Sequence, residues 1–483
     1  MQTTANTTLS QMMLREISAG LEREHAAFHA RYPGPSGERQ PIHTYYCAGD
    51  LFRRDLVRTL SDLALLSLEE FAPDFITFAK AIGLPGAERL PDAPSAAKLA
   101  QSIESDPESA RKDDRAAWFA HTIYTRVRER LLQRPVEDLR ADFEDGYGNR
   151  PWDEEDRHAA AAAGEIAAAI ETGARAPSFG IRIKPFSEDL RARSLRTLDI
   201  VVTELAAAKA RDHFPAKFYV NLAKITVPGE VAALANACSH LEKLLDLRTG
   251  TLRIELMIET TQSVINERGE ANLLPLVDAA GGRCVAAHFG TYDYTAARGI
   301  TAAHQQILHP ACDFAREVMQ VALAGTGVWL SDGATNVLPV APHRADGHAA
   351  LTAQQIAENR AAVHAAWKLH FGHVRHSLVN GFYQGWDLHP AQLPTRYAAV
   401  YSFFLESLEP AAARLRALIE KGTQPSGGDV ADDAATGQGL LAYVARAIDC
   451  GAVSEPEAAI LTGLSAQKIR SASFAGIVAA RRK

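Results

Sequence analysis

The sequence of 483 residues has no long hydrophobic run, no pair of closely spaced cysteines and no block of basic residues. Because no stretch of eighteen or more uncharged apolar residues occurs, we expect no membrane-spanning helix. Residues 1–41 contain no basic region followed by an apolar core, so they do not resemble a secretory signal. We expect them to form an N-terminal helix instead.

The five cysteines are scattered and form no CxxC pair. This argues against a disulfide framework and a structural zinc site, and it favours a reducing cytoplasm. The net charge of −7 comes without a basic patch, so we expect no nucleic-acid partner. With 47% apolar and 23% charged residues, the composition is that of an ordinary globular protein.

Short β-branched or aromatic runs alternate with long Ala-, Leu-, Glu- and Arg-rich stretches, a pattern typical of βα units around a parallel sheet. Eight such runs favour a closed (β/α)₈ TIM barrel, of class α/β. The expected strands are Ile42–Cys47, Leu139–Phe143, Phe179–Lys184, Lys217–Leu222, Leu252–Ile258, Cys284–Phe289, Gly327–Leu330 and Ser377–Tyr383.

Two segments exceed a minimal barrel, which we place at residues 42–393. A helical insertion of about ninety residues, roughly 50–137, follows the first strand and is too long for an ordinary βα loop. Residues 394–483 form the second addition, a helical C-terminal extension that is interrupted by the Gly/Pro/Ser-rich sequence TQPSGGD.

Chemistry in a barrel lies at the C-terminal ends of the strands, and polar residues stand at four of the expected ends. They are Asp142, Glu144 and Asp145 after strand two, Arg182 with Lys184 on strand three, Glu259 after strand five and Asp293 after strand six. Two carboxylates on neighbouring strands satisfy what Mg²⁺ needs from a protein, since water and substrate fill its other positions. A 2-oxo acid can supply two oxygens to such a metal, which then polarises the keto group.

The residues alone leave other interpretations open. Glu259 and Asp293 could each be a helix N-cap or a surface ion-pair partner. Arg182 could be a structural partner of the acidic DFED segment, whose carboxylates could support metal ligands without binding metal themselves. For Lys224, in NLAKIT, the simpler interpretation is an exposed strand end.

Six motifs occur in order along the chain: ADFEDGY, IRIKPF, VNLAKI, MIETTQSV, FGTYDYT and GFYQGWDLHPAQL. Together they resemble the HpcH/HpaI aldolase and citrate lyase β-subunit family, in the superfamily that includes malyl-CoA lyases and malate synthases. The resemblance covers roughly residues 135–440.

Carried over residue by residue, the resemblance implies that Glu259 and Asp293 are the Mg²⁺ ligands. It implies that Arg182, with Gly290 and Thr291, binds the substrate, and that Arg182 holds its keto or enolate oxygen. Asp142, Glu144, Asp145 and Lys224 would support this site from behind. His389 and Pro390 match a histidine–proline turn, to which we assign a structural role or a place at the mouth of the site.

VADDAATGQ resembles the acidic segment of the malate synthase C-terminal domain, where an aspartate deprotonates acetyl-CoA. On that match Asp433 would be the general base, with Asp432 beside it, and the tail would fold over the barrel mouth. Two aspartates that simply cap the following helix are the equally weighted alternative. The chain departs from the family at Ala223, Thr226, Thr291 and Tyr292, which puts the substrate's identity in doubt.

The expected protein is a cytoplasmic, Mg²⁺-dependent carbon–carbon lyase or aldolase that acts on a small 2-oxo acid or its CoA-thioester adduct. The alternatives are malate-synthase-like condensation of glyoxylate with an acyl-CoA, phosphoenolpyruvate-type phosphotransfer, thioester hydrolysis and a non-catalytic scaffold. No P-loop supports phosphotransfer. CoA use stays open, and the resemblance implies a homo-oligomer without a defined number of subunits.

Overall fold

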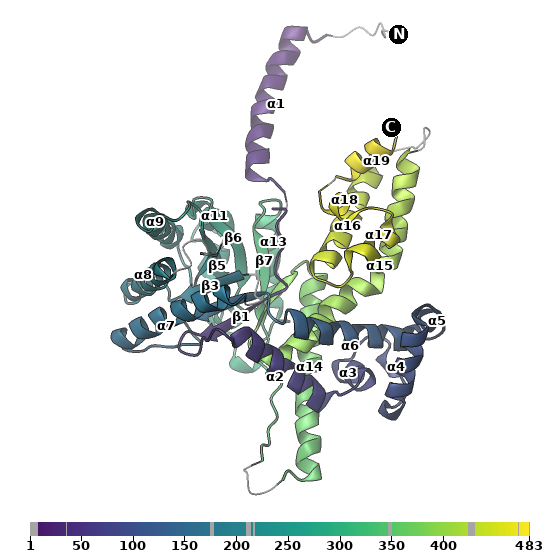
Figure 1. The fold of residues 1–483 in the computed structure, drawn as a ribbon. Helices are drawn as coiled ribbons and strands as arrows, with labels where there is room; N and C mark the ends of the chain where they lie inside the picture. The colour runs from purple at the N-terminus through teal and green to yellow at the C-terminus, as the bar shows by residue number, and fades with distance from the viewer. Residues whose placement is uncertain are drawn as a thin grey trace.

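A computed structural model describes residues 8–34, 36–173, 178–208, 214–215, 218–345, 350–423, 430–471 and 473–482, without the side chains at 423, 430–433, 471 and 482. Eight parallel strands pair in chain order, and the last pairs with the first to close a barrel (Figure 1). The strands are β1 (His43–Ala48), β2 (Asp138–Asp142), β3 (Ser178–Ile183), β4 (Phe218–Leu222), β5 (Leu252–Ile258), β6 (Cys284–Phe289), β7 (Trp329–Ala334) and β8 (Gln384–Asp387).

This confirms the (β/α)₈ barrel, and the first six expected strands agree with the observed ones to within one residue. Lys217, the expected start of the fourth strand, lies outside the described residues. The seventh begins two residues later than expected and runs on to Ala334.

The eighth expected strand, Ser377–Tyr383, was wrong. Helix α14 (Ala353–Val379) extends into the first three residues of this segment, and Ser377 and Leu378 belong to its buried face. Gly381 then adopts a left-handed φ of 78°, and the chain enters β8 only at Gln384. The run Ser377–Tyr383 therefore forms the end of α14 and the turn that leads into β8.

The inward face of the barrel is polar along its length. Arg140, which is 1% exposed, donates to Asp138 at 2.7 Å and to Glu255 at 2.9 Å across the interior. Buried charges are tolerated only when they are paired in this way. The outward faces of the same strands are apolar and pack on the helices.

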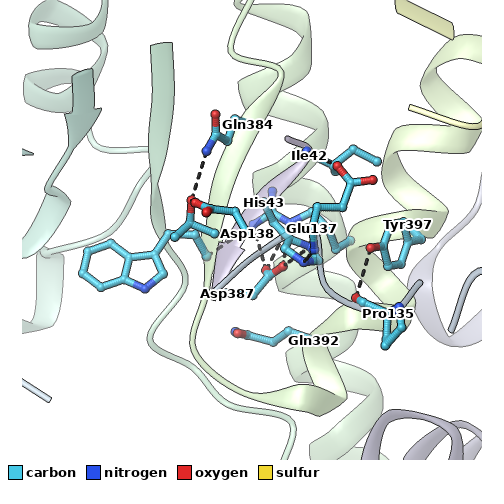
Figure 2. A network of polar contacts seen from close by, with 12 residues as sticks. Ile42, His43, Pro135, Glu137, Asp138, Gln384, Asp387, Gln392 and Tyr397 are labelled. Atoms are coloured by element: carbon cyan, nitrogen blue, oxygen red, sulfur yellow. Dashed lines mark hydrogen bonds and ion pairs between the residues drawn. The ribbon is translucent and has the colours of Figure 1, made fainter. Parts of the chain in front are cut away.

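A second polar network lies where β8 closes on β1 (Figure 2). Asp387 accepts hydrogen bonds from Arg396 at 2.8 Å, and the rings of His43 and His370 lie 3.2 and 3.1 Å from its oxygens. Nearby, the backbone N–H of Ile42 donates to a Glu137 carboxylate oxygen at 2.8 Å. The network therefore ties β1, β2 and β8 to α14 and the helix that follows β8.

Helices surround the barrel as each βα unit requires, and a 3₁₀ turn η5 (Pro390–Gln392) follows β8 (Figure 1). They are α7 (Trp152–Glu171), α8 (Arg191–Ala207), α9 (Pro228–Leu244), α10 (Thr261–Val264), α11 (Leu273–Ala279), α12 (Thr291–Ala297), α13 (Pro310–Leu323), α14 and α15 (Leu393–Thr423). The 27-residue α14 starts with a capping box in which Thr352 and Gln355 satisfy each other's backbone N–H groups.

The segment between β1 and β2 is helical, with short 3₁₀ turns η1 (Ala87–Arg89) and η2 (Ala93–Ser95). Its helices pack on α14, α15 and η5 rather than on the strands. They are α2 (Leu56–Phe71), α3 (Phe75–Ile82), α4 (Ala96–Ser105), α5 (Pro107–Asp113) and α6 (Arg115–Gln133).

The chain ends in further helices. α16 (Val430–Asp449), α17 (Glu455–Thr462) and α19 (Phe474–Arg482) pack along α15, and α18 (Ala466–Ser471) packs on α16 and α17. At the other terminus, α1 (Gln11–Arg31) projects from the barrel and buries none of its residues (Figure 1). Within the described parts of the chain, no helix has both the length and the hydrophobicity needed to cross a membrane.

Candidate active site

The charged residues expected from the sequence gather at the C-terminal ends of neighbouring strands. Asp142 ends β2, Arg182 lies one residue before the end of β3, and Glu259 directly follows β5. Asp293 lies in the first turn of α12, just past β6. Parallel strands bring all of these ends to one rim of the barrel, where active sites of this fold lie.

Arg182 is 2% exposed and is bound on one side by Asp142. Its Nε and Nη2 donate to the two Asp142 oxygens at 2.7 and 2.6 Å, while Nη1 lies 3.4 Å from Glu144. Burial alone would lower the pKa of Arg182, but the Asp142 carboxylate raises it above its ordinary value. Arg182 is therefore a fixed cation, and Nη1 is its least committed nitrogen.

Asp142 is an anchor for the turn that follows β2. Besides Arg182, it accepts the backbone N–H groups of Glu144 at 3.0 Å and Gly146 at 2.9 Å. A Cβ on Gly146 would lie 2.5 Å from the Asp142 carboxylate, so this turn requires glycine. Asp142 thus orients Arg182 and Glu144 and has no oxygen left without a partner.

Lys224 follows β4 in a left-handed conformation, with φ of 50°. This conformation aims its backbone N–H at Glu259 Oε1, 2.7 Å away. Its Nζ donates to Glu144 and to Asp145 and lies 3.5 Å from Asp293 Oδ2. The left-handed conformation costs a non-glycine residue free energy. In this conformation the backbone N–H binds Glu259 while the ammonium lies among the carboxylates of Glu144, Asp145 and Asp293.

The lysine therefore lies within the acidic cluster and is not the exposed strand end of the simpler interpretation. Burial raises the pKa of Glu144, although Arg182 and Lys224 oppose that rise. Burial also raises the pKa of Asp145, but the hydrogen bond from Lys224 lowers it, and the net pKa lies below its ordinary value.

Glu259 is 2% exposed and directly follows β5, so its carboxylate is a buried group of the rim. Burial raises the pKa of its carboxyl to about 7, and the negative charge of Asp293 adds to the rise. Gly290 makes room for it, because a Cβ there would overlap the Glu259 side chain. Next to this glycine, Thr291 is buried and its hydroxyl has no hydrogen-bond partner among the described residues.

These residues fit a magnesium ion by the chemistry of their donors. Glu259 and Asp293 offer hard carboxylate oxygens, their charges repel each other, and a divalent cation would relieve that repulsion. The Lys224 ammonium already provides positive charge beside them. Within the described residues, no group of three or more His, Cys, Asp or Glu side chains is placed to hold a metal, so any ion would depend on these two carboxylates, water and substrate.

Two further expectations concern Lys184 and Asp433. Lys184 turns away from the rim, because its Nζ binds the Phe143 carbonyl and Glu155 of α7. Asp433 belongs to α16, but its side chain, like that of Asp432, lies outside the described residues. The described part of α16 faces the opposite end of the barrel, beside the starts of β7 and β8.

Sequence reasoning missed Tyr46 and Trp386, whose rings pack together beside Arg182 with centroids 4.6 Å apart. The Arg182 guanidinium carbon lies 4.9 Å from the centre of the Tyr46 ring and 5.0 Å from that of Trp386. Trp386 Nε1 is buried without a hydrogen-bond partner among the described residues. Alternation along β8 would have pointed Trp386 inward, but the strand had been placed too early in the chain.

The fold and this rim define a (β/α)₈-barrel protein with a cluster of charged residues at the mouth of the barrel. The chain belongs to the family described as a domain of unknown function, DUF6986, whose model matches residues 21–477. No curated protein matches the sequence.

Several solved structures are similar in part. A Haloferax volcanii malate synthase, in a lead(II) complex, is 15% identical with a TM-score of 0.37, over 54% of this chain and 64% of that one. RipC from Yersinia pestis is 17% identical with a TM-score of 0.34, over 55% and 88%. The citrate lyase β subunit from M. tuberculosis, complexed with oxaloacetate and magnesium, is 15% identical with a TM-score of 0.34, over 58% and 92%. The chain thus spans less than two thirds of that malate synthase chain. TM-scores this low do not indicate a shared function.

Proposed function

We propose that this protein is a Mg²⁺-dependent enzyme that makes or breaks a carbon–carbon bond next to the carboxylate of a 2-oxo acid. The observation that carries the proposal is the convergence of Arg182, Glu259 and Asp293 on one rim of the barrel. A scaffold protein has no use for a buried arginine facing two mutually repelling carboxylates. Such an arrangement is costly unless a ligand compensates it.

Glu259 and Asp293 would hold the magnesium ion, and their carboxylates are the two donors that the ion needs from the chain. When bound, magnesium supplies Lewis-acid polarisation of the keto group. Among the described residues, Thr291 Oγ1 and Trp386 Nε1 have no hydrogen-bond partners, so we assign them to the substrate's carboxylate. Together with Gly290, which brings the backbone close, they would orient the 2-oxo acid.

Arg182 would stabilise the oxygen that becomes negative when the bond to its carbon is broken or formed. Its Nη1 is available for that oxygen because Nε and Nη2 are fixed by Asp142. The rings of Tyr46 and Trp386 pack together beside the guanidinium and bury it. A preorganised donor of this kind typically contributes a hundredfold or more to the rate.

A malate-synthase-like condensation also needs a general base to remove a proton from the acyl group. We assign this role to Asp433, because VADDAATGQ resembles the acidic segment of the malate synthase C-terminal domain. The described residues of α16 lie at the other end of the barrel. Asp433 would therefore act at the barrel mouth of another subunit, or α16 would have to move.

The test is a turnover screen on the purified protein with and without MgCl₂. Oxaloacetate, malyl-CoA, and glyoxylate with acetyl-CoA would be offered to the wild type and to Glu259→Ala, with exposed Glu267→Ala as the matched control. We expect one substrate to turn over only with MgCl₂, and the Glu259 variant to lose at least a hundredfold in kcat/KM. Turnover that survives in Glu259→Ala would refute the assignment of the site.

A further variant, Asp433→Asn, separates the lyase from the condensation. If condensation is lost and Mg²⁺ binding is kept, Asp433 is the base. If nothing turns over although Mg²⁺ binds, the substrate class is wrong, and phosphotransfer and thioester hydrolysis are tested next with phosphoenolpyruvate and acyl-CoA.

A further inference from the structure

A cavity of about 510 Å³ lies at the end of the barrel opposite to the charged rim. The segment that precedes β1, the starts of β7 and β8, and helices α15 and α16 all contribute to its wall. Its size falls in the range of sites for small organic molecules. Its lining residues include Trp329, Tyr383, Phe404, Arg446, Asp449 and Arg470.

Arg446 is the unusual group in this cavity. Its guanidinium carbon lies 3.9 Å from the centre of the Tyr383 ring, and the described residues offer it no hydrogen bond and no carboxylate. The neighbouring Arg470, in contrast, is bound to Asp449 at 3.1 Å and to Glu455 at 2.6 Å. Arg446 thus lies against an aromatic ring, and its N–H groups are not bonded to any described residue.

The chemistry of this wall selects a type of ligand. A planar guanidinium binds a carboxylate through two parallel hydrogen bonds. Asp449 is already paired with Arg470, and the Glu38 carboxylate also lines the cavity. Because one cation lacks a partner and two carboxylates are near, a ligand with a single negative charge fits better than a polyphosphate.

The remainder of the wall is aromatic and aliphatic. The rings of Tyr383 and Phe404 stack with centroids 6.2 Å apart and planes 24° from parallel, and Trp329 and Ile469 line the same space. Flat apolar groups pack favourably against such rings. The ligand should therefore have a flat apolar body and an acidic group at one end.

We propose that this cavity is a second ligand site, which binds a small amphiphilic monoanion, an aromatic or similarly flat carboxylate, with Arg446 as its anion anchor. The site is separate from the proposed catalytic centre and does not depend on it. It lies at the starts of β7 and β8, whereas Arg182 lies near the end of β3. A ligand bound there would contact both the barrel and α16.

The test compares two fluorescent probes with the same ring system. 8-Anilino-1-naphthalenesulfonate carries one anionic group, and N-phenyl-1-naphthylamine carries none. We expect the wild type to bind one equivalent of the anionic probe. In Arg446→Gln that affinity should fall about tenfold, as for the loss of a charge-assisted hydrogen bond, while the neutral probe should bind within twofold of the wild type.

The matched control is Arg414→Gln, an exposed arginine on α15, which should bind both probes like the wild type. Arg446→Lys, which keeps the charge but loses the planar donors, should show an intermediate loss and serves if Arg446→Gln does not fold. 4-Phenylbutyrate should displace the anionic probe, and its amide should not.

Unchanged affinity for the anionic probe in both Arg446 variants would overturn the proposal. Displacement of the probe by oxaloacetate with MgCl₂ would also overturn it, because the probe would then occupy the mouth of the barrel. Neither result would bear on the proposed catalytic function, which the turnover screen tests separately.

Discussion

Replacing Lys224 by methionine removes an ammonium that lies among the carboxylates of Glu144, Asp145 and Asp293. Methionine keeps much of the side-chain volume, so the change is mainly one of charge. Glu144 loses its closest cation, Asp145 loses a 2.9 Å hydrogen bond and Asp293 loses a positive charge 3.5 Å away. The backbone N–H of residue 224 remains and can still bind Glu259.

The expected loss of stability without metal follows from burial. Removing one partner of a fully buried ion pair costs about 3–5 kcal/mol, but the Lys224 side chain is 30% exposed and Arg182 also faces Glu144. The contact with Asp145, whose side chain is 61% exposed, adds only about 0–1 kcal/mol. We therefore expect the free energy of unfolding to fall by about 2–3 kcal/mol.

The effect on magnesium binding has the opposite sign. A unit charge about 4 Å away contributes about 4 kcal/mol at an effective dielectric constant near 20. Part of that repulsion is cancelled because the ammonium is already tied to Glu144, so we expect Mg²⁺ to bind Lys224→Met about tenfold more tightly than the wild type. Saturating MgCl₂ should then recover most of the lost stability by mass action.

The assay combines isothermal titration with MgCl₂ and urea unfolding with and without the salt, with exposed Lys98→Met as the control. Weaker or unchanged Mg²⁺ binding in Lys224→Met would refute the reasoning. It would mean that Lys224 positions the ligands instead of competing with the ion. Equal destabilisation of the variant with and without MgCl₂ would refute it as well.

Three other predictions follow from the structure. Gly290→Ala places a Cβ against Glu259, so it should weaken Mg²⁺ binding at least tenfold in titration while Gly229→Ala, with open space around it, should not. Asp387→Asn leaves buried Arg396 without its carboxylate and should lower the free energy of unfolding by about 3–5 kcal/mol in urea, and a loss below 1 kcal/mol would contradict the network in Figure 2. Burial lowers the pKa of His373 to about 4, below an unfolded value near 6.5, so the neutral ring stabilises the protein above pH 6.5 and that contribution is lost as the pH falls toward 4. Between pH 7.5 and 5 the wild type should therefore lose about 2 kcal/mol more stability than His373→Gln, and equal losses would show that this histidine is not the group that titrates.

The sequence predicted the barrel because strand periodicity and strand–helix alternation are local properties. It also predicted which residues share the rim, since a polar residue after an apolar run marks a strand end. It could not predict that Lys224 adopts a left-handed φ and binds Glu259 through its backbone, because that conformation depends on carboxylates more than thirty residues away.

The missed eighth strand shows a second limit. Ser377–Tyr383 has strand-like composition, yet Ser377 donates to Asp332 at 2.6 Å as part of the buried face of α14. Tertiary packing made this segment helical. Because the eighth strand was placed a few residues too early, Trp386 was not predicted to point into the barrel. The cavity beside Arg446 was beyond sequence reasoning for the same reason, since segments far apart in the sequence form its wall.

The charges of the rim imply an order of binding. The described residues set two cations, Arg182 and Lys224, against the carboxylates of Asp142, Glu144, Asp145, Glu259 and Asp293, so the rim carries an excess of negative charge when its carboxylates are ionised. A 2-oxo acid is itself an anion and would be repelled by this excess, whereas a divalent cation would be attracted and would reduce it. Oxaloacetate should therefore show no measurable binding in titrations without MgCl₂ and should bind once MgCl₂ is present. Equal binding under both conditions would place the substrate carboxylate away from Glu259 and Asp293, and the assignment of this rim to 2-oxo acid chemistry would fail.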